Sequence, residues 1–523
     1  MQTEQLYQLY LQHPVISTDT RKITPGCIFF ALKGDKFDAN KFAQLAIEAG
    51  AAYALIDDPA YRADERYILV EDVLTALQQL AKHHRLQLTI PVIGLTGTNG
   101  KTTTKELISA VLSQHFKTQF TQGNLNNHIG VPLTLLTIGA SHEMAVIEMG
   151  ANHQKEIAFL CTIAQPTHGL ITNVGKAHLE GFGGFEGVKI GKGELYDYLK
   201  KSESEFPSSP LLELSPTNRD AAGMTNTPEL VGDKPNKGEG IAIATESRWL
   251  SGPKGAFGVA FINNDNPILL EMQKARGLEN VIYYGTTGNN NLVSGSLLEN
   301  SPYLTIQWAN SQTGESRAVK TQLTGAYNLD NILAAACIGV YFRLTPDEIN
   351  RGIAGYQPKN NRSQIVQTAT NTLICDYYNA NPSSMIVAIE NMDKLSANRK
   401  VLILGDMFEL GDEAAAEHEA IIHKALDTAV DERIFIGEEF FKAGLKASSP
   451  PLLGLSPTNR NAADAKSTPE LVGDNSNKGA GHSFFYKSAE NAIAAIKANP
   501  IKNSTILIKG SRGMALERLV ELF

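Results

Sequence analysis

The sequence predicts an α/β protein of three domains, each with a largely parallel sheet covered by helices. The chain has 523 residues, more than a single hydrophobic core usually holds. Short apolar runs alternate with stretches of helical periodicity, the pattern of strand–helix–strand units. A glycine-rich turn joins one such apolar run to a helix. We expect the domains at residues 1–88, 89–320 and 321–523.

The first domain begins with alternating strand and helix patterns. Residues 27–32 form an apolar run typical of a buried strand, and residues 53–56 form a second one. Between them, residues 41–49 have helical spacing. Residues 72–84 predict a closing helix, and the boundary to the next domain falls near residues 86–89.

The second and third domains repeat this alternation. In the second, a strand at 91–95 leads into a helix from Thr102, and further strands are expected at 145–147 and 169–172. The third begins near Leu323, and its expected strands are residues 373–375, 401–404, 433–436 and 505–508. Helical stretches separate these strands, which predicts a parallel sheet with crossover helices.

Composition narrows the function classes. The net charge of −8 disfavours nucleic acid as the main partner, because phosphate backbones bind basic surfaces. The first residues have no signal-peptide pattern, and no apolar run approaches the ~20 residues of a membrane span. The four cysteines form no CxxC pair, so we expect reduced thiols and neither a zinc site nor disulfides. A cytoplasmic protein is expected.

Two segments of the chain match each other without a gap. Residues 208–238 and 449–479 both contain LSPTNR and TPELVGD, and both are rich in Pro, Asn, Gly, Ser and Thr. Repeats that stack into solenoids are adjacent in sequence, whereas these are far apart. We interpret them as related insertions, at about 203–240 and 447–481, in surface loops that tolerate added length. A shared docking function is the less favoured alternative.

The strongest local motif is a phosphate-binding loop. GTNGKTT, residues 97–103, follows an apolar strand and precedes a helix, which is the setting of a P-loop. Its backbone N–H groups and the helix N-terminus favour phosphate oxygens. Lys101 would reach the β- and γ-phosphates, and the Thr102 hydroxyl would bind Mg²⁺. The spacing departs from GxxxxGK[ST], since Leu95 occupies the first glycine position.

Three downstream motifs add groups that suit metal chemistry. Glu148 ends an expected strand in the manner of a carboxylate that binds Mg²⁺. His178 follows the strand 169–172 in a glycine-bounded loop, and Lys192 stands near the start of a helix. Taken singly, each is as well explained as a solvated surface side chain, and a lone histidine is rarely a magnesium ligand.

Together, the motifs GTNGKTT, EMGA, TNVGKAHLEGFG and GKGEL resemble the central domain of the Mur ligase family. The resemblance implies a P-loop central domain, a Rossmann-like C-terminal domain, and ATP with two Mg²⁺ ions. It further implies that Lys192 is carbamylated by CO₂ and becomes an anionic metal ligand. The implied catalytic residues are Lys101, Glu148, His178 and Lys192; the implied metal ligands are Thr102, Glu148, His178 and Lys192.

Motifs of the second and third domains resemble one branch of that family. DYYNANPSS (376–384), GNLNNHIGVP (123–132) and LGDMFELG (404–411) are typical of the branch that joins D-alanyl-D-alanine to UDP-N-acetylmuramoyl-tripeptide in peptidoglycan synthesis. The DNPR signature of a sibling branch is absent. The resemblance therefore implies an ATP-dependent, ADP-forming amide ligase with an acyl-phosphate intermediate, and these two molecules as its partners.

The same resemblance assigns the binding residues. The ATP-binding set is Gly97, Thr98, Asn99, Gly100, Lys101, Thr102, Thr103, Asn328, Asn331, Arg362 and Asp376. The substrate-binding set is Thr18, Asp19, Thr20, Arg21, Lys33, Asn126, Asn127, Asn379 and Asn381. Arg21 and Lys33 would pair with the diphosphate of the nucleotide, although plain surface charge explains Lys33 equally well. Asn381, just before Pro382, also fits a simple helix cap.

Two alternatives remain open at this point. One is another ATP-dependent ligase of the same superfamily, such as a folylpolyglutamate synthase, which lacks the YNANP motif. The other is a nucleotide-binding regulator without catalysis, which the intact Lys101, Glu148, His178 and Lys192 disfavour. We expect a monomer that has no membrane span and does not bind nucleic acid.

Overall fold

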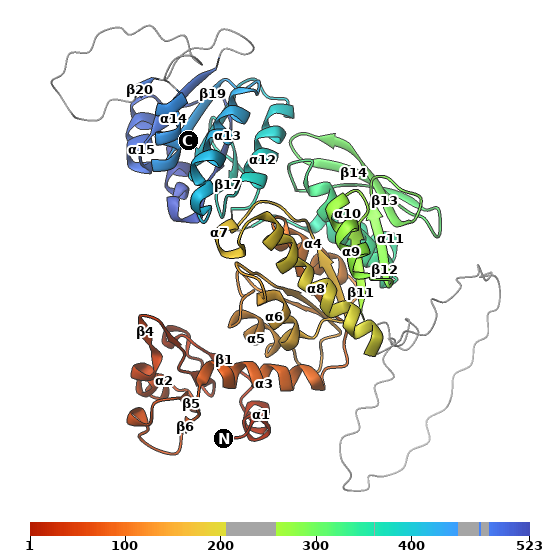
Figure 1. Cartoon of the computed structure of the whole chain (residues 1–523), viewed down its shortest axis with the longest axis vertical. Coiled ribbons are helices and arrows are strands. Elements are labelled where there is room, and N and C mark those ends of the chain that lie inside the picture. The colour runs from red at the N-terminus through yellow and green to blue at the C-terminus, as the bar shows by residue number, and fades with distance from the viewer. Residues whose placement is uncertain (206–257, 360, 448–469, 472–480) are drawn as a thin grey trace, which may run out of the picture.

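The computed structural model contains three α/β units, in agreement with the predicted fold class (Figure 1). It describes residues 1–205, 258–359, 361–447, 470–471 and 481–523, so most of both expected insertions lies outside the described residues. The sheets of the three units have four, nine and seven strands. Within the described residues, no helix combines the length and the apolar character that crossing a membrane requires.

The N-terminal unit is a small parallel sheet with helices on both faces. Its elements are α1 (Thr3–Gln12), β1 (Ile16–Ser17), β2 (Ile28–Phe30), the hairpin β3 (Lys33–Gly34) and β4 (Phe37–Asp38), α2 (Ala43–Glu48), β5 (Tyr53–Ile56), β6 (Tyr67–Leu69) and α3 (Val73–Gln87). The parallel order is β1-β2-β5-β6. Alternate residues of a strand point to opposite faces, so Ile28 and Phe30 pack with α1 and α3, whereas Phe29 packs with α2.

The central unit is a large sheet in which the P-loop follows an interior strand, the third from one edge. Its strands are β7 (Val92–Thr96), β8 (Thr118–Phe120), β9 (Met144–Glu148), β10 (His168–Ile171), β11 (Val259–Asn263), β12 (Val281–Gly285), β13 (Asn291–Asn300), β14 (Leu304–Asn310) and β15 (Ser316–Lys320). The order is β15-β14-β13-β12-β11-β10-β7-β9-β8, and β7 pairs in parallel with both β9 and β10. The loops at the carboxyl ends of these three strands therefore meet at one edge of the sheet.

Helices cover both faces of the central sheet. They are α4 (Lys101–Leu112), α5 (Gly130–Leu135), α6 (Glu156–Ala164), α7 (Leu179–Phe182), α8 (Phe185–Glu205), α9 (Pro267–Arg276), α10 (Asn328–Tyr341) and α11 (Pro346–Gly355). Helices α10 and α11 pack against α4 and the central sheet, because their buried alanines and isoleucines extend the apolar cluster there. The expected boundary at 320/321 therefore falls before two helices that belong structurally to the central unit.

The third unit is a parallel sheet with antiparallel edge strands. Its elements are β16 (Gln364–Gln367), β17 (Thr372–Asp376), α12 (Pro382–Lys394), β18 (Lys400–Gly405), α13 (Ala414–Leu426), β19 (Glu432–Ile436), α14 (Glu438–Ala447), β20 (Glu470–Leu471), β21 (His482–Tyr486), α15 (Ala489–Ala498) and β22 (Thr505–Lys509). The order is β16-β17-β22-β18-β19-β21-β20, and all pairs except the two outermost are parallel. The four strands expected from sequence correspond to β17, β18, β19 and β22.

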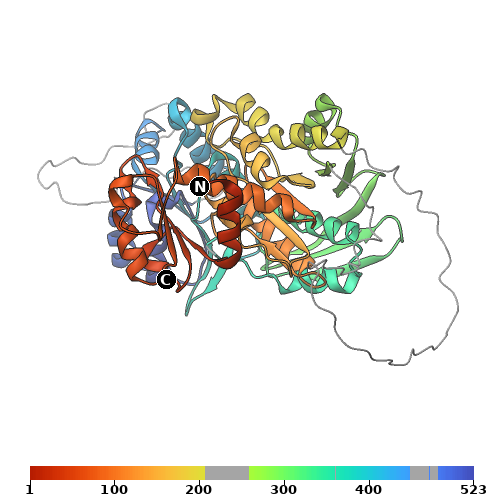
Figure 2. The ribbon, with the colours of Figure 1, turned by 90° about the horizontal axis from the view of Figure 1, so that it is seen from below.

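The N-terminal unit is fastened to the central unit by a shared core. Helix α3 packs on α5 and α6, and one apolar cluster runs from α1 and α3 into the central sheet. The Tyr10 hydroxyl donates to Leu136 O at 2.7 Å. The buried Arg85 donates to Ala164 O at 3.0 Å and to Gln165 O at 2.9 Å, and burial lowers its pKa to about 10. The N-terminal and third units lie at opposite ends of the molecule, with the central unit between them (Figure 1). Seen from below, the N-terminal unit lies in front of the third unit (Figure 2).

Replacing Arg85 by methionine tests this attachment. The change leaves two buried carbonyls without their charged donor, so we expect the free energy of unfolding to fall by about 2–4 kcal/mol. Thermal unfolding of the variant, compared with the same replacement at the exposed Arg62, measures the effect. Equal Tm values for the two variants would contradict a fastening role for Arg85.

Candidate active site

A cavity of about 900 Å³ lies between the central and third units. Its central wall comes from the loops after β7, β9 and β10, and its opposite wall from residues 362–387 and 509–512. Sixteen expected site residues line it: Thr98, Asn99, Gly100, Lys101, Thr102, Thr103, Asn126, Asn127, Glu148, His178, Asn328, Asn331, Arg362, Asp376, Asn379 and Asn381. Residues far apart in sequence therefore converge where the P-loop was expected to act.

The P-loop between β7 and α4 has a backbone that requires glycine. Gly97 has φ 145° and Gly100 has φ 77°, and a Cβ on Gly97 would lie 2.0 Å from Thr172 Oγ1. The Lys101 ammonium folds back over the loop and donates to Gly97 O at 2.8 Å and Thr98 O at 3.0 Å. Burial lowers its pKa to about 8, an effect that Glu148 opposes. These carbonyl bonds hold Lys101 beside the position of a bound phosphate.

The loop between β10 and α7 fastens the P-loop from one side. Thr98 N donates to Asn173 O at 2.9 Å, and Asn99 N donates to Asn173 Oδ1 at 2.9 Å. Thr172 Oγ1 donates to Asn99 O at 2.6 Å, and Gly175 N donates to Thr98 Oγ1 at 2.9 Å. This role of Asn173 was not predicted from the sequence, because the bonds join loops that are distant in the chain.

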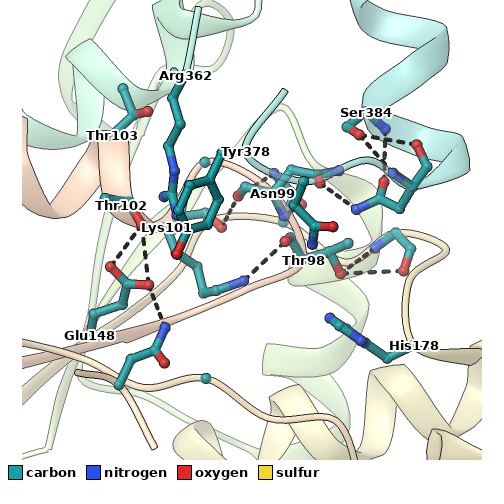
Figure 3. Close-up of a pocket in the computed structure, with 18 of the residues that line it drawn as sticks. Thr98, Asn99, Lys101, Thr102, Thr103, Glu148, His178, Arg362, Tyr378 and Ser384 are labelled. Carbon is teal, nitrogen blue, oxygen red and sulfur yellow. Dashed lines mark hydrogen bonds between the residues drawn. The ribbon is translucent and has the colours of Figure 1, made fainter. Parts of the chain in front are cut away.

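Glu148 ends β9 as a buried carboxylate with several donors around it. The Thr102 hydroxyl donates to Glu148 Oε2 at 3.0 Å, and Asn126 Nδ2 donates to Oε1 at 2.8 Å (Figure 3). Thr102 and Glu148 thus supply the hydroxyl and carboxylate oxygens that hold Mg²⁺ beside nucleotide phosphates. Among the residues that the structure describes, no three His, Cys, Asp or Glu side chains gather into a metal site. Phosphate oxygens and water would have to complete the coordination.

The Asn127 side chain, in contrast, accepts hydrogen bonds from the backbone. Its side-chain oxygen accepts from Ile129 N at 3.1 Å and from Gly130 N at 2.9 Å, which caps the start of α5. The two neighbouring asparagines, both expected to bind substrate, therefore differ in their contacts: Asn126 orients the carboxylate and Asn127 shapes the loop.

A second lysine, Lys105, lies behind Glu148 and was not singled out from the sequence. Its side chain is 0% exposed, and its ammonium lies 3.7 Å from both Glu148 Oε2 and Glu106 Oε1. Its Nζ has no hydrogen-bond partner among the described residues. Burial lowers the pKa of Lys105, while Glu148 and Glu106 raise it. The sequence did contain one indication of this residue: a lysine stands one helical turn after Lys101, on the apolar face of α4.

The third unit contacts the P-loop directly. Asn381 Nδ2 donates to Asn99 Oδ1 at 2.9 Å, and Asn99 Nδ2 donates to Ser383 Oγ at 3.1 Å (Figure 3). Asn381 also caps α12 through Ser384 N at 2.9 Å. The Asn99 side chain is thus directed at the third unit in this structure, and both Asn381 and Asn99 are engaged in joining the two units. Asn379 remains exposed.

One ion pair and one histidine–carboxylate contact join the units beside these bonds. Lys176 Nζ lies 2.6 Å from Glu417 Oε1, and His178 Nδ1 contacts Glu409 Oε2. His178 and Glu409 have φ of 51° and 62°, in the left-handed region that non-glycine residues rarely adopt. Figure 3 shows His178 apart from Thr102 and Glu148. The structure therefore places the expected metal ligand His178 against the third unit instead.

Charged and aromatic groups of the third unit form the far wall. The Arg362 guanidinium carbon lies 3.9 Å from the centre of the Tyr378 ring, and that of Arg512 lies 5.5 Å from it. Asp376 Oδ2 lies 2.6 Å from Lys509 Nζ. Arg362 and Asp376 were expected here, whereas Tyr378 was part of the DYYNANPSS motif without an assigned role. Stacking on Tyr378 fixes the direction of both guanidinium groups.

Asn328 and Asn331 connect α10 to the P-loop helix. Asn331 Nδ2 donates to Asn328 Oδ1 at 2.8 Å, and Thr104 Oγ1 donates to Asn331 Oδ1 at 2.9 Å. Asn328 Nδ2 donates to Thr324 O at 2.8 Å. Both side chains line the cavity, and their mutual bond fixes which polar atoms face it.

Lys192 is buried behind the cavity wall and does not line it. Its ammonium donates to Ala151 O at 3.1 Å and lies 4.9 Å from the centre of the Phe182 ring. Burial, with repulsion from Lys101, lowers its pKa to about 7. A large fraction of this amine is therefore neutral near pH 7, unlike an ordinary lysine.

The expected substrate residues of the N-terminal unit lie away from this cavity. Arg21 NH2 pairs with Asp19 Oδ2 at 2.8 Å, and the Arg21 side chain is 87% exposed. Lys33 Nζ pairs with the buried Asp57 at 2.7 Å, and this partner raises the pKa of Lys33. Thr18, Thr20 and Gly97 also do not line the cavity. A ligand that is held by Arg21 or Lys33 and also reacts in the cavity would have to extend from one unit to the other.

Comparison with protein-family models covers most of the chain. Residues 14–85 match the Mur ligase family catalytic domain, and residues 361–512 match the Mur ligase glutamate ligase domain. The Mur ligase middle domain matches residues 95–206 and 243–339. The interruption between 206 and 243 contains the first of the two matching segments.

Individual relatives agree with these matches. A UDP-N-acetylmuramoyl-tripeptide–D-alanyl-D-alanine ligase of Escherichia coli is 32% identical over 97% of this chain and 92% of its own length. A crystal structure of MurF from Acinetobacter baumannii superimposes with a TM-score of 0.73 and 26% identity, covering 99% of this chain and 97% of that one. MurF of Thermotoga maritima in complex with ADP, at 21% identity and a TM-score of 0.71 over 98% and 97% of the two chains, shares the fold.

Replacing Asn99 by alanine tests the contact between the units. The change removes two hydrogen bonds of about 1 kcal/mol each. We therefore expect the population of molecules in which the third unit contacts the P-loop to fall by up to about thirtyfold. Small-angle scattering without ligands should then show a larger radius of gyration. Ser383→Ala, which removes one bond, should have a smaller effect, and the two changes should not add. An unchanged radius in both variants would show that other contacts hold the third unit.

Proposed function

The chain belongs to the Mur ligase family, and from this we infer that it is an ATP-dependent ligase that joins D-alanyl-D-alanine to UDP-N-acetylmuramoyl-tripeptide. One observation supports this function above the others: the P-loop and the third-unit motif at 376–384 face each other across a single cavity. A reaction that activates one substrate with ATP and then adds a second needs such a two-walled site. The YNANP motif lies on this wall, which disfavours a folylpolyglutamate synthase.

The chemistry must turn an unreactive carboxylate into an electrophile. A terminal carboxylate oxygen of the tripeptide attacks the γ-phosphorus of ATP, the bond to the bridging oxygen breaks, and ADP leaves. The amine of D-alanyl-D-alanine then attacks the acyl carbon, and the tetrahedral intermediate expels phosphate as the amine loses its proton. The products are the amide, ADP and phosphate.

The chain contributes charge, orientation and exclusion of water. Lys101 and the P-loop N–H groups stabilise negative charge on the transferred phosphoryl group. Arg362, with Tyr378 behind it, supplies a fixed cation from the third unit. Bonds from Asn99 to Asn381 and Ser383 close the cavity, which protects the acyl phosphate from water. Asn328 and Asn331 are proposed to contact the adenosine, and the exposed Asn379 the incoming peptide.

We propose that Thr102 and Glu148 hold one Mg²⁺ ion. The support is the adjacent hydroxyl and carboxylate at the P-loop, a donor pair that suits this ion. When bound, the ion would neutralise phosphate charge beside Lys101.

We further propose that a second Mg²⁺ ion binds to His178 and to a carbamylated Lys192. Its support is the lowered pKa of Lys192, about 7, because only the neutral amine reacts with CO₂. The unmodified side chains do not form a cation site, since the Lys192 ammonium faces a carbonyl and His178 contacts Glu409. The second ion therefore depends on the carbamate.

Further proposals concern the wider setting of the enzyme. Thr18, Asp19, Thr20, Arg21 and Lys33 are proposed to bind the UDP moiety, with Arg21 and Lys33 exchanging carboxylate partners for the diphosphate. The domain limits 1–88, 89–320 and 321–523, with insertions at about 203–240 and 447–481, remain proposals. So do action in the cytoplasm, where ATP is available, and a monomeric state, which light scattering with chromatography measures.

The function is tested by phosphate release from the purified protein with ATP and Mg²⁺. We expect release only when UDP-N-acetylmuramoyl-tripeptide and D-alanyl-D-alanine are both present, together with a UDP-linked pentapeptide detected by mass. Release with neither substrate, or none with the pair, would direct the search to other acceptors and then to a non-catalytic regulator.

Lys192→Ala tests the carbamate. We expect activity to fall about 100-fold, because an anionic metal ligand is lost, and added bicarbonate should not restore it. In the unmutated protein, ¹³CO₂ should give a carbamate NMR signal that grows as pH rises through about 7, since deprotonation exposes the amine. Lys189→Ala, on the same helix, is the control. Normal turnover of the Lys192 variant would remove the carbamate from the mechanism.

A further inference from the structure

The buried ammonium of Lys105 has no part in the chemistry described above. It lies on α4 one turn beyond Lys101, its side chain is 0% exposed, and its Nζ has no hydrogen-bond partner among the described residues. Its neighbours of opposite charge are Glu148 and Glu106, each at 3.7 Å. Glu106 is held in turn by the Tyr356 hydroxyl, which donates to its Oε2 at 2.8 Å.

This arrangement is a poor source of stability. Removing an ammonium from water costs free energy that ion pairs recover only with close geometry and hydrogen bonds for all its protons. At 3.7 Å, Lys105 meets neither condition. An apolar side chain of the same length would fill the position at lower cost. The presence of a charge therefore points to a function at the carboxylate it faces.

The surroundings of Glu148 show what that charge does. Oε1 accepts from Asn126, Oε2 accepts from Thr102, and Lys105 approaches Oε2 from the protein side. Before any ligand arrives, Lys105 already offsets part of the charge of this carboxylate, and its oxygens already have donors. A divalent cation approaching Glu148 alone would be repelled by Lys105 and would have to displace those donors.

We propose that Lys105 is a positioning residue that acts as the resident counter-ion of Glu148, so that the divalent cation binds only together with nucleotide phosphates. The phosphates add the negative charge that Lys105 has cancelled, and the metal and nucleotide therefore enter as one unit. This rests on the proposed function in one respect, the assignment of a Mg²⁺ ion to Thr102 and Glu148.

The test uses Mn²⁺ as the probe and the full chain without nucleotide. Free and bound Mn²⁺ are distinguished by electron paramagnetic resonance during titration of the unmutated protein, Lys105→Met and Lys105→Gln. We expect the dissociation constant for Mn²⁺ to fall at least about tenfold in both variants, because the repelling charge is gone. Lys117→Met, the same replacement at an exposed lysine, should bind as the unmutated protein does. Lys105→Gln keeps the test valid if the methionine variant does not fold.

Three results would overturn the proposal. The first is a dissociation constant in both variants equal to or higher than that of the unmutated protein. The second is tighter binding that persists when Glu148→Gln is added, which would place the ion elsewhere. The third is a lowered Tm with unchanged Mn²⁺ binding, which would make Lys105 a structural residue. Failure of the ligase itself is read separately, as absence of the UDP-linked pentapeptide from the unmutated protein, and does not alter the metal titration.

Discussion

The hydrogen bonds between the P-loop and the loop after β10 are the constraint on which the site depends. Thr98 and Asn99 use their backbone atoms to bind Asn173, and this leaves the Asn99 side chain directed at the third unit. The same β10–α7 loop then supplies Lys176 and His178 to Glu417 and Glu409. One pair of neighbouring loops thus fixes both the phosphate site and the position of the opposite wall.

The site is also built from cations held in a dry environment. Lys105 and Lys192 are buried and Lys101 is partly buried, and burial lowers the pKa of each. Burying such groups costs free energy of folding, but they need no reorganisation when an anion arrives. The cost is offset by the large shared core of the N-terminal and central units and by the pairing of β7 with β9 and β10. Stability from the fold therefore supports charges that serve the site.

Local patterns in the sequence were sufficient to predict much of the fold and part of the site. Strand runs and glycine spacing located β7, α4 and Lys101, and the acidic strand end located Glu148, because these depend on residues adjacent in the chain. The direction of the Asn99 and Asn381 side chains could not be predicted. It depends on contact between two units, and the two residues are 282 positions apart in the sequence. The same holds for His178, whose partner Glu409 is distant. The packing of α10 and α11 on α4 could not be predicted either, because nothing local indicates which sheet a helix covers.

The two junctions between units differ in kind. An apolar cluster crosses from the N-terminal unit into the central one, whereas among the described residues each apolar cluster of the third sheet stays within that unit. The junction to the third unit is made of polar contacts around Asn99, Lys176 and His178: an ion pair, a histidine–carboxylate contact and hydrogen bonds. Ionic strength weakens such contacts but spares an apolar core. In calorimetry, added salt should therefore separate the melting of the third unit from a joint melting of the other two. The peaks in the heat capacity would then show how the chain divides into cooperatively unfolding parts.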